Sequence, residues 1–245
     1  MQVDKAVFCP LCERSVSLCF NITESDLISE DWFFCQCGGW FHKGLFDQKI
    51  FNIDYFKKFN EIREIKERID YLIRLYAPLI EDGTYGRRFL DVGFTINEMM
   101  SQMKDRGWNC YGSEIIDKEV FENKFPIFSG DFEKYKINEK FDFIHLGHVF
   151  ECFDSPRDAF TKVYFLTRDE GYILIRCVSP ELIHTLGLKG FGHFQSNEKR
   201  FFIPMQWFKN MANLLNLDII CSVKNISKRM NIWNDYHLLL KKRTY

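Results

Sequence analysis

The apolar residues between Tyr55 and Ile80 recur at steps of three and four, with Lys, Arg and Glu between them. This spacing places the apolar side chains on one face and predicts an amphipathic helix that ends near Pro78. The turn-rich segment 81–86 then leads into the next element. We therefore assign residues 51–86 to a helix and linker, and we expect a separate domain to begin at residue 87.

Beyond this linker, short apolar runs that are typical of buried strands alternate with helical patterns. Strands are predicted over residues 88–92, 109–112, 141–146, 171–178, 217–223 and 236–240, and helices over 97–106, 117–123, 155–166 and 204–215. The alternation predicts a parallel sheet with helices on both faces. The last two strands have no room for a crossover helix between them and should pair antiparallel. The predicted fold class is therefore α/β, a Rossmann-like doubly wound sheet with an antiparallel C-terminal strand pair.

The composition is that of a folded globular protein. Of the 245 residues, 46% are hydrophobic and 27% are charged, and Lys+Arg 33 against Asp+Glu 34 gives a net charge of -1. This balance provides no overall field to attract nucleic acid or an anionic membrane. The sequence also contains no apolar run near the ~20 residues of a membrane span and no signal-peptide pattern, so we expect a cytoplasmic protein with no membrane contact.

Cysteines are concentrated near the start of the chain. Cys9 and Cys12 form a C-x2-C pair, and Cys35 and Cys37 follow after 22 intervening residues as a pair with one spacer. Tetrahedral Zn²⁺ needs four nitrogen or sulfur ligands, which paired thiolates on two short turns supply. We therefore predict a small zinc-binding module over residues 1–50. Its zinc would be structural, because four thiolates leave no coordination position for water.

The single-residue spacer of the second pair departs from the usual zinc ribbon and leaves Cys19 or His42 as a substitute ligand. Unrelated free thiols are the alternative to a metal site. The other four of the nine cysteines lie in apolar surroundings and are expected to be small buried side chains.

Asp91 and Gly93 follow the first predicted strand of the α/β region and precede a helix. A dinucleotide-binding loop needs three glycines so that a pyrophosphate can reach the helix N-terminus, and this loop has only Gly93. The sequence therefore argues against NAD and FAD. Glu114 lies 23 residues after Asp91, at the end of the second strand. Its two carboxylate oxygens can accept hydrogen bonds from both hydroxyls of a ribose.

Four segments of the α/β region together resemble the class I S-adenosylmethionine-dependent methyltransferases. They are FLDVG at 89–93, YGSEI at 111–115, SGDF at 129–132 and FDFIHLGHVFE at 141–151. More narrowly, the chain resembles small-molecule and sugar methyltransferases that carry an N-terminal zinc ribbon. Residues 148–151 match the His-Val-Leu-Glu of those relatives, with Cys152 in place of the next His, and residues 198–204 are similar to their Glu-His-x-x-Phe-Phe segment. The resemblance implies a methyltransferase domain over residues 87–245.

The resemblance also implies which residues bind S-adenosylmethionine. It places Asp91 and Gly93 against the amino-acid end of the cofactor, Glu114 on the ribose, Ile115 on adenine, and Asp131 with Phe132 at the adenine edge. Phe94, Thr95 and Gly147 complete the expected set. Thr95 stands where the family has Gly or Ser, so we expect a tighter turn around the cofactor.

The implied activity is methyl transfer from S-adenosylmethionine to a small polar acceptor, with a sugar or a sugar phosphate as candidates. A hydroxyl acceptor needs a base, and His148, just after a strand, and His193, in a glycine-rich stretch, are the candidate catalytic residues. Residues 181–245 carry 10 basic and 4 acidic residues. This local excess would suit an anionic small-molecule acceptor, although Lys241, Lys242 and Arg243 are expected to be a solvated end of the chain.

Two other functions fit parts of the sequence. A degenerate methyltransferase fold would bind the cofactor or a partner without turnover, because Thr95, Asn97 and Cys152 depart from the family pattern. A nucleic-acid methyltransferase with the zinc module as its reader is disfavoured. Residues 1–50 carry 4 basic and 7 acidic residues, whereas phosphate contact needs clustered Lys and Arg. The sequence gives no signal for the oligomeric state.

Overall fold

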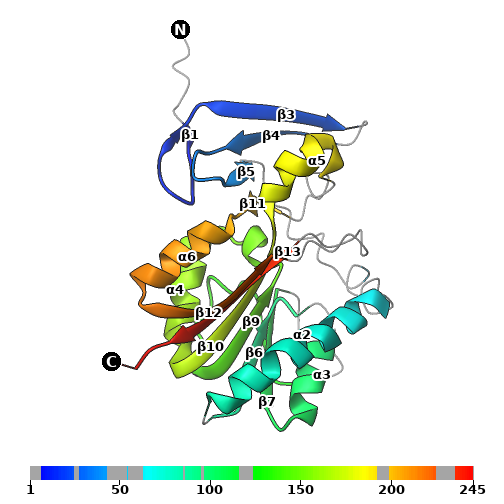
Figure 1. The fold of residues 1–245 in the computed structure, drawn as a ribbon, viewed down its shortest axis with the longest axis vertical. Helices are drawn as coiled ribbons and strands as arrows, with labels where there is room; N and C mark the ends of the chain where they lie inside the picture. Colours follow the sequence, from blue (N-terminus) through cyan, green and yellow to red (C-terminus); the bar gives the residue numbers. More distant parts are fainter. Residues whose placement is uncertain are drawn as a thin grey trace.

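The computed structural model describes residues 7–24, 28–42, 54, 63–84, 86–94, 97–115, 124–191, 199–224 and 235–244. Its main element is a seven-stranded sheet with the order β12-β13-β10-β9-β6-β7-β8 (Figure 1). The strands are β6 (Arg88–Val92), β7 (Asn109–Glu114), β8 (Ile127–Ser129), β9 (Phe141–Gly147), β10 (Thr167–Val178), β12 (Leu217–Lys224) and β13 (Asp235–Lys242). Strands β8, β7, β6, β9 and β10 are parallel, and β13 is antiparallel to both β10 and β12. The predicted fold class and the antiparallel C-terminal pair are confirmed.

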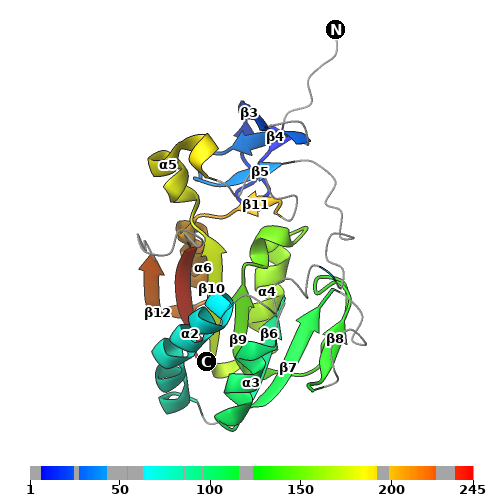
Figure 2. The same cartoon turned by 90° about the vertical axis from the view of Figure 1, so that its right-hand side faces the viewer.

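Helices cover both faces of this sheet (Figure 2). They are α2 (Arg63–Asp82) and α3 (Glu98–Asp105) on one face, and α4 (Pro156–Leu166) and α6 (Met205–Leu214) on the other. Because successive strand residues point to opposite faces, Phe143 of β9 packs in the core under α2 and α3, whereas Ile144 packs in the core under α4 and α6. Three short helices, η3 (Phe150–Cys152), η4 (Pro180–Leu182) and α5 (Ile183–Gly190), follow strands β9 and β10. No helix in the described part of the chain is long and apolar enough to cross a membrane.

Helix α2 extends beyond its predicted end, and Pro78 lies inside it. A proline removes one backbone hydrogen bond from a helix and favours a kink or an end. Here Ala77 and Ile80 are buried in the core, and this packing holds the last turn in place. The predicted helix over 117–123 and the predicted start of α2 near Tyr55 lie outside the described residues.

The N-terminal part forms two small sheets. Strands β1 (Val7–Phe8) and β2 (Ser15–Val16) make a short hairpin. Strands β3 (Leu18–Glu24), β4 (Ile28–Phe34) and β5 (Trp40–His42) form an antiparallel sheet, and β11 (Phe201–Phe202) pairs with β5 as its fourth strand. Strand β11 has no signal in the sequence, because two residues are too few to show strand alternation. The N-terminal sheet is thus completed by a segment from the other end of the chain.

This N-terminal module, residues 7–42, lies beyond the carboxyl ends of the parallel strands (Figure 1). The indole Nε1 of Trp207 on α6 donates to the carbonyl oxygen of Leu11 at 2.8 Å. The backbone N–H of His42 donates to the carbonyl oxygen of Arg200 at 3.2 Å. Leu11 and Phe41 are buried in the same core as residues of α4 and α6. The module therefore packs directly on the α4 and α6 side of the large sheet.

We expect Trp207→Phe to lower the free energy of unfolding by about 1 kcal/mol, because the buried carbonyl of Leu11 loses an N–H donor while the aromatic packing is largely kept. Urea denaturation of the full chain measures this change. Gln206→Ala, on the exposed side of the same helix, is the control and should change stability by less than about 0.5 kcal/mol. Equal stability of Trp207→Phe and wild type would show that this hydrogen bond does not hold the module.

Candidate functional site

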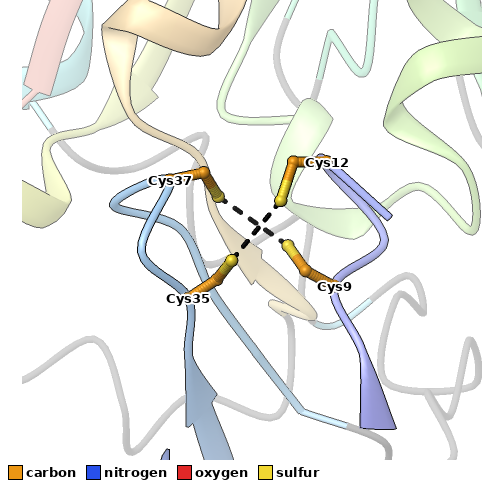
Figure 3. Close-up of side chains that lie close together, drawn as sticks. All are labelled: Cys9, Cys12, Cys35 and Cys37. Carbon is orange, nitrogen blue, oxygen red and sulfur yellow. Dashed lines mark hydrogen bonds between the residues drawn. The ribbon is translucent and has the colours of Figure 1, made fainter. Parts of the chain in front are cut away.

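Cys9, Cys12, Cys35 and Cys37 lie on two turns that face each other (Figure 3). The first turn follows β1, and the second joins β4 to β5. In the second turn, the N–H of Gly38 donates to the carbonyl oxygen of Cys35 at 2.8 Å. Gly38 has a φ of +85°, a conformation that glycine adopts without steric cost. The two turns aim all four thiols at one point.

The spacing of the four sulfur atoms fits a zinc ion. All four lie within 4.8 Å of one another, with Cys9 Sγ 3.8 Å from Cys37 Sγ and Cys12 Sγ 3.4 Å from Cys35 Sγ. Zinc in a tetrahedron of sulfurs, with Zn–S bonds of about 2.3 Å, places the sulfurs ~3.8 Å apart. The four cysteines could therefore hold a zinc ion.

The two substitute ligands considered from the sequence lie elsewhere. Cys19 is exposed on β3. Nε2 of His42 lies 2.8 Å from the carbonyl oxygen of Lys199. Among the residues that the structure describes, the group that could hold a metal ion is formed by Cys9, Cys12, Cys35 and Cys37.

Cys9 is poised to bind a metal. Its pKa is lowered to about 5, mainly because it accepts a hydrogen bond from Cys37, and the same bond raises the pKa of Cys37. The thiolate is the form of cysteine that ligates metals. The lowered pKa of Cys9 thus favours the form of its side chain that a zinc ion would need.

Four of the predicted cofactor residues meet at one edge of the large sheet. Asp91, Gly93, Glu114 and Gly147 lie at or just beyond the ends of strands β6, β7 and β9. Strands β7 and β8 lie on one side of β6, and β9 and β10 lie on the other, so the strand order reverses between β6 and β9. In open α/β sheets, ligands bind outside the carboxyl ends of the strands at such a switch point.

Gly93 and Glu114 shape this edge. Gly93 has a φ of +70°, and a Cβ on it would lie 3.0 Å from Cγ2 of Val149, so the turn requires glycine. Its N–H donates to the carbonyl oxygen of Ser113 at 2.8 Å. Glu114 is 8% exposed, and its Oε1 accepts the N–H of Ile115 at 2.8 Å. The Glu114 carboxylate is thereby held at the end of β7.

Two of the predicted cofactor residues have buried aromatic side chains. Phe94 packs so closely on Gly112 that a Cβ there would lie 2.6 Å from its ring. Phe132 stacks on Phe153 with ring centroids 5.7 Å apart. Both side chains serve the core, so their backbone groups are what they can offer a ligand.

Asp131 follows β8, and its carboxylate contacts two residues of its own turn. Its Oδ1 accepts the N–H of Glu133 at 3.0 Å, and its Oδ2 lies 2.7 Å from the Nζ of Lys134. Thr95 and His193 lie outside the described residues.

A layer of polar side chains that the sequence analysis did not identify, apart from Asp91, lies at the same edge. We call it the polar layer; it consists of Asp91, His145, Arg176, Asp235 and His237 on the sheet and Arg68 and Tyr76 on α2. The strand register pairs Asp91 with His145 and pairs Arg176 with both Gly147 and His237. Side chains in register point to the same face, here the face that α2 covers. A polar residue within a buried apolar strand, as in FDFIHLG and YILIRCV, was the available signal.

Asp91 and His145 form a buried pair on adjacent strands. Nδ1 of His145 lies 2.7 Å from Oδ1 of Asp91. Burial lowers the pKa of His145 more than the neighbouring Asp91 raises it, so the imidazole is neutral at pH 7. A neutral ring carries one N–H, and the carboxylate assigns it to Nδ1. Nε2 of His145 is therefore a hydrogen-bond acceptor.

Asp235 lies at the centre of the polar layer and is 1% exposed. Its carboxylate forms an ion pair with Arg68 of α2. Its Oδ2 also lies 3.3 Å from Nε2 of His148 and 3.5 Å from Nε2 of His237. Burial alone would raise the pKa of Asp235, but its contacts with His148 and His237 and the charge of Arg176 keep it well below its usual range. Asp235 is thus a buried carboxylate that stays ionised.

Glu151 is fully buried and joins three segments. Its Oε1 accepts the backbone N–H of Val178 at 2.8 Å and lies 3.6 Å from the Nζ of Lys199. Its carbonyl oxygen accepts the N–H of Arg200 at 2.7 Å. Burial alone would raise the pKa of Glu151, but the charge of Lys199 and the contact with His148 lower it to about 2. Glu151 is therefore an ionised carboxylate with a structural role.

His148 lies between these two carboxylates. Its Nδ1 is 3.6 Å from Oε1 of Glu151, and its Nε2 faces Asp235. Its φ is +58°, which is uncommon for a residue with a side chain. Its N–H donates to the carbonyl oxygen of Arg176 at 2.8 Å. The predicted catalytic residue is thus held at the edge of the sheet beside the polar layer.

The polar layer is not satisfied by its own hydrogen bonds. Buried atoms without a hydrogen-bond partner in the described structure include His145 Nε2, Arg176 Nε, Asp235 Oδ1, His237 Nε2 and, next to the layer, Glu151 Oε2. Each such atom costs about 1–3 kcal/mol. Native proteins keep few of them, and a cluster indicates a place where a ligand or water supplies the missing groups.

Residues 62–222 match a family model described as a methyltransferase domain. A methyltransferase of Archaeoglobus fulgidus, described as SAM-dependent, has the same fold, with a TM-score of 0.56, 18% identity and coverage of 80% of this chain and 100% of that one. The N-methyltransferase NodS of Bradyrhizobium japonicum, in complex with S-adenosyl-L-homocysteine, matches with a TM-score of 0.56 and 10% identity. The match covers 76% of this chain and 91% of that one. The comparison with curated proteins gave no match. Because the family model matches more than half of the 245 residues, this chain belongs to the family of proteins with this methyltransferase domain.

Proposed function

We propose that this chain transfers the methyl group of S-adenosylmethionine to a small polar acceptor at the carboxyl edge of the sheet. The observation that carries the proposal is the polar layer, which lies at the switch point of a methyltransferase-family fold and contains unsatisfied buried polar atoms within the described residues. The complex of NodS with S-adenosyl-L-homocysteine supports the choice of cofactor. The cofactor would supply a methyl group already activated by its sulfonium.

We assign the nucleoside part of the cofactor to the ends of β7 and β8. Glu114 holds a carboxylate at the end of β7, where it can accept hydrogen bonds from ribose hydroxyls. Ile115 follows it directly, and Asp131 with the backbone of Phe132 follows β8, the neighbouring strand. Gly93 leaves the turn after β6 without a side chain. Phe94, Thr95 and Gly147 remain in the proposed set.

We place the acceptor beside His148. Both of its ring nitrogens lie within 3.6 Å of a carboxylate oxygen, of Glu151 on one side and Asp235 on the other. A proton taken from an acceptor hydroxyl would pass to this imidazole, which lies between the two carboxylates. The chain then has to align the acceptor oxygen with the methyl group and exclude water. His193 remains the second candidate for the base.

The charge of the acceptor is less constrained than the sequence implied. Lys199 pairs with Glu151 at 3.6 Å, and Arg200 pairs with Asp154 at 2.5 Å. These two cations of the basic C-terminal part are thus matched within the protein. We therefore propose a neutral polyhydroxylated acceptor such as a sugar ahead of a sugar phosphate.

Two measurements test the proposed function. Isothermal titration calorimetry of the full chain should detect binding of S-adenosylmethionine and S-adenosylhomocysteine. Incubation with methyl-labelled S-adenosylmethionine and a panel of sugars, sugar phosphates and small amines should then label at least one acceptor. Binding without labelling would favour a fold that retains the cofactor but lacks turnover. If neither S-adenosylmethionine nor S-adenosylhomocysteine binds, the proposal is contradicted.

Glu114→Ala should weaken binding of S-adenosylhomocysteine by about 1–3 kcal/mol, roughly a 5- to 150-fold rise in Kd, because two ribose hydroxyls lose a charged acceptor. Calorimetry measures the change, and circular dichroism confirms folding. Glu67→Ala, an exposed position on α2, is the control and should leave the Kd unchanged. An unchanged Kd in folded Glu114→Ala would place the ribose elsewhere.

For a hydroxyl acceptor, His148→Ala should lower kcat by ~10²–10⁴, the usual range for loss of a general base, with little change in cofactor affinity. Steady-state kinetics with the labelled acceptor measure this effect. His193→Ala is the matched variant and should raise the KM for the acceptor more than it lowers kcat. Full turnover by His148→Ala together with loss of turnover in His193→Ala would transfer the role of base to His193.

We also propose that the cysteine group holds one structural zinc ion per chain. Elemental analysis should find one equivalent in wild type and much less in Cys12→Ser, because a three-thiolate site binds zinc less tightly. Cys19→Ser, which changes an exposed cysteine outside the group, should keep full zinc content. Wild-type protein purified without chelator and holding far less than one equivalent would rule out this role.

A further inference from the structure

His145 carries an acceptor for which the described part of the chain supplies no donor. Its Nδ1 faces Asp91, and its buried Nε2 has no hydrogen-bond partner there. No sequence pattern assigns His145 a role, and the proposed function counts it in the polar layer without giving it a part in binding or catalysis. A donor from a bound molecule would remove the cost of about 1–3 kcal/mol for this unpaired atom.

Arg176 lies on the adjacent strand and flanks the same position. A Cβ on Gly147 would lie 3.2 Å from Nε2 of His145 and 3.5 Å from Nη2 of Arg176. Because Gly147 has no side chain, the imidazole and the guanidinium both border the space where one would be. Arg176 is 8% exposed, and its Nε is 3.9 Å from the carboxylate of Asp235, beyond hydrogen-bond distance.

These two side chains suit two different ligand groups, one positively charged and one negatively charged. The imidazole of His145 accepts a hydrogen bond and has the carboxylate of Asp91 behind it, so it suits an ammonium. A guanidinium donates several parallel N–H bonds and suits a carboxylate. An α-amino acid carries an ammonium and a carboxylate on one carbon, and S-adenosylmethionine ends in this group.

We infer that His145 and Arg176 together hold the amino-acid end of S-adenosylmethionine, the imidazole accepting a hydrogen bond from the ammonium and the guanidinium donating to the carboxylate. The inference rests on the proposed function, because it requires the cofactor at this edge of the sheet. It also changes the role of Asp91, which positions His145 and fixes its tautomer instead of meeting the cofactor directly.

Calorimetry with substituted variants and truncated ligands tests the inference. His145→Asn keeps a donor toward Asp91 but removes the acceptor at the Nε2 position, and it should raise the Kd for S-adenosylhomocysteine about 10- to 100-fold. The same variant should bind the analogue of S-adenosylhomocysteine that lacks the amino group with the same Kd as wild type. Arg176→Gln should raise the Kd for S-adenosylhomocysteine by a similar factor and leave the Kd for decarboxylated S-adenosylhomocysteine unchanged. His184→Asn changes an exposed histidine on α5 and is the matched control. It should leave the Kd for S-adenosylhomocysteine and for both analogues unchanged.

The outcomes separate this inference from the proposed function. If wild type binds S-adenosylhomocysteine and both variants bind it equally well, the inference is wrong and the proposed function stands. If a variant loses all ligands equally, including 5′-methylthioadenosine, which lacks the amino-acid part, the residue shapes the fold and does not recognise that part. If wild type binds none of them, the proposed function fails first.

A measurement on wild type covers the case in which a variant does not fold. Nitrogen NMR of the histidine rings should show His145 as the Nδ1–H tautomer. Its Nε2 resonance should shift on addition of S-adenosylhomocysteine and stay in place with 5′-methylthioadenosine. A resonance that responds equally to both ligands would overturn the inference.

Discussion

The candidate base and the attachment of the N-terminal module both depend on the contacts of one ionised carboxylate, that of Glu151. A fully buried charge is tolerated only when partners surround it, and its partners come from separate places in the chain. They are the N–H of Val178 at the end of β10, the ammonium of Lys199 and the imidazole of His148. Lys199 lies two residues before β11, the strand that completes the N-terminal sheet. One carboxylate therefore fixes the candidate base and the attachment of the N-terminal module together.

The N-terminal module supports the proposed acceptor site from beyond the sheet. Nε2 of His42 contacts the carbonyl oxygen of Lys199 at 2.8 Å, and Trp32 stacks on Phe202 with ring centroids 4.8 Å apart. A module of this size has little core of its own, so a metal held by its two cysteine turns would supply the missing stability. Zinc would then act on methyl transfer indirectly, by keeping β5 and β11 paired.

The polar layer shows how a buried sheet can carry charge. Strands covered on both faces are mostly apolar, and one group of polar exceptions in this sheet lies at the carboxyl ends, where α2 adds Arg68. The layer contains two carboxylates, Asp91 and Asp235, and two guanidiniums, Arg68 and Arg176. The opposite charges balance, which lowers the cost of burying them. Their unsatisfied atoms leave the layer suited to a ligand that carries both signs of charge.

Local pattern in the sequence determined the elements and much of their chemistry. The apolar run 88–92 gave β6 with its observed bounds, and the short last connection predicted the antiparallel pair of β12 and β13, because burial and turn length act over few residues. Cysteine spacing likewise pointed to the four thiols, but Cys19 and His42 were separated from them only by the folded turns. His145, Arg176 and Asp235 were brought together only through the order and register of β9, β10 and β13. Sequence spacing does not encode which strands become neighbours, so only the tertiary structure decided that contact.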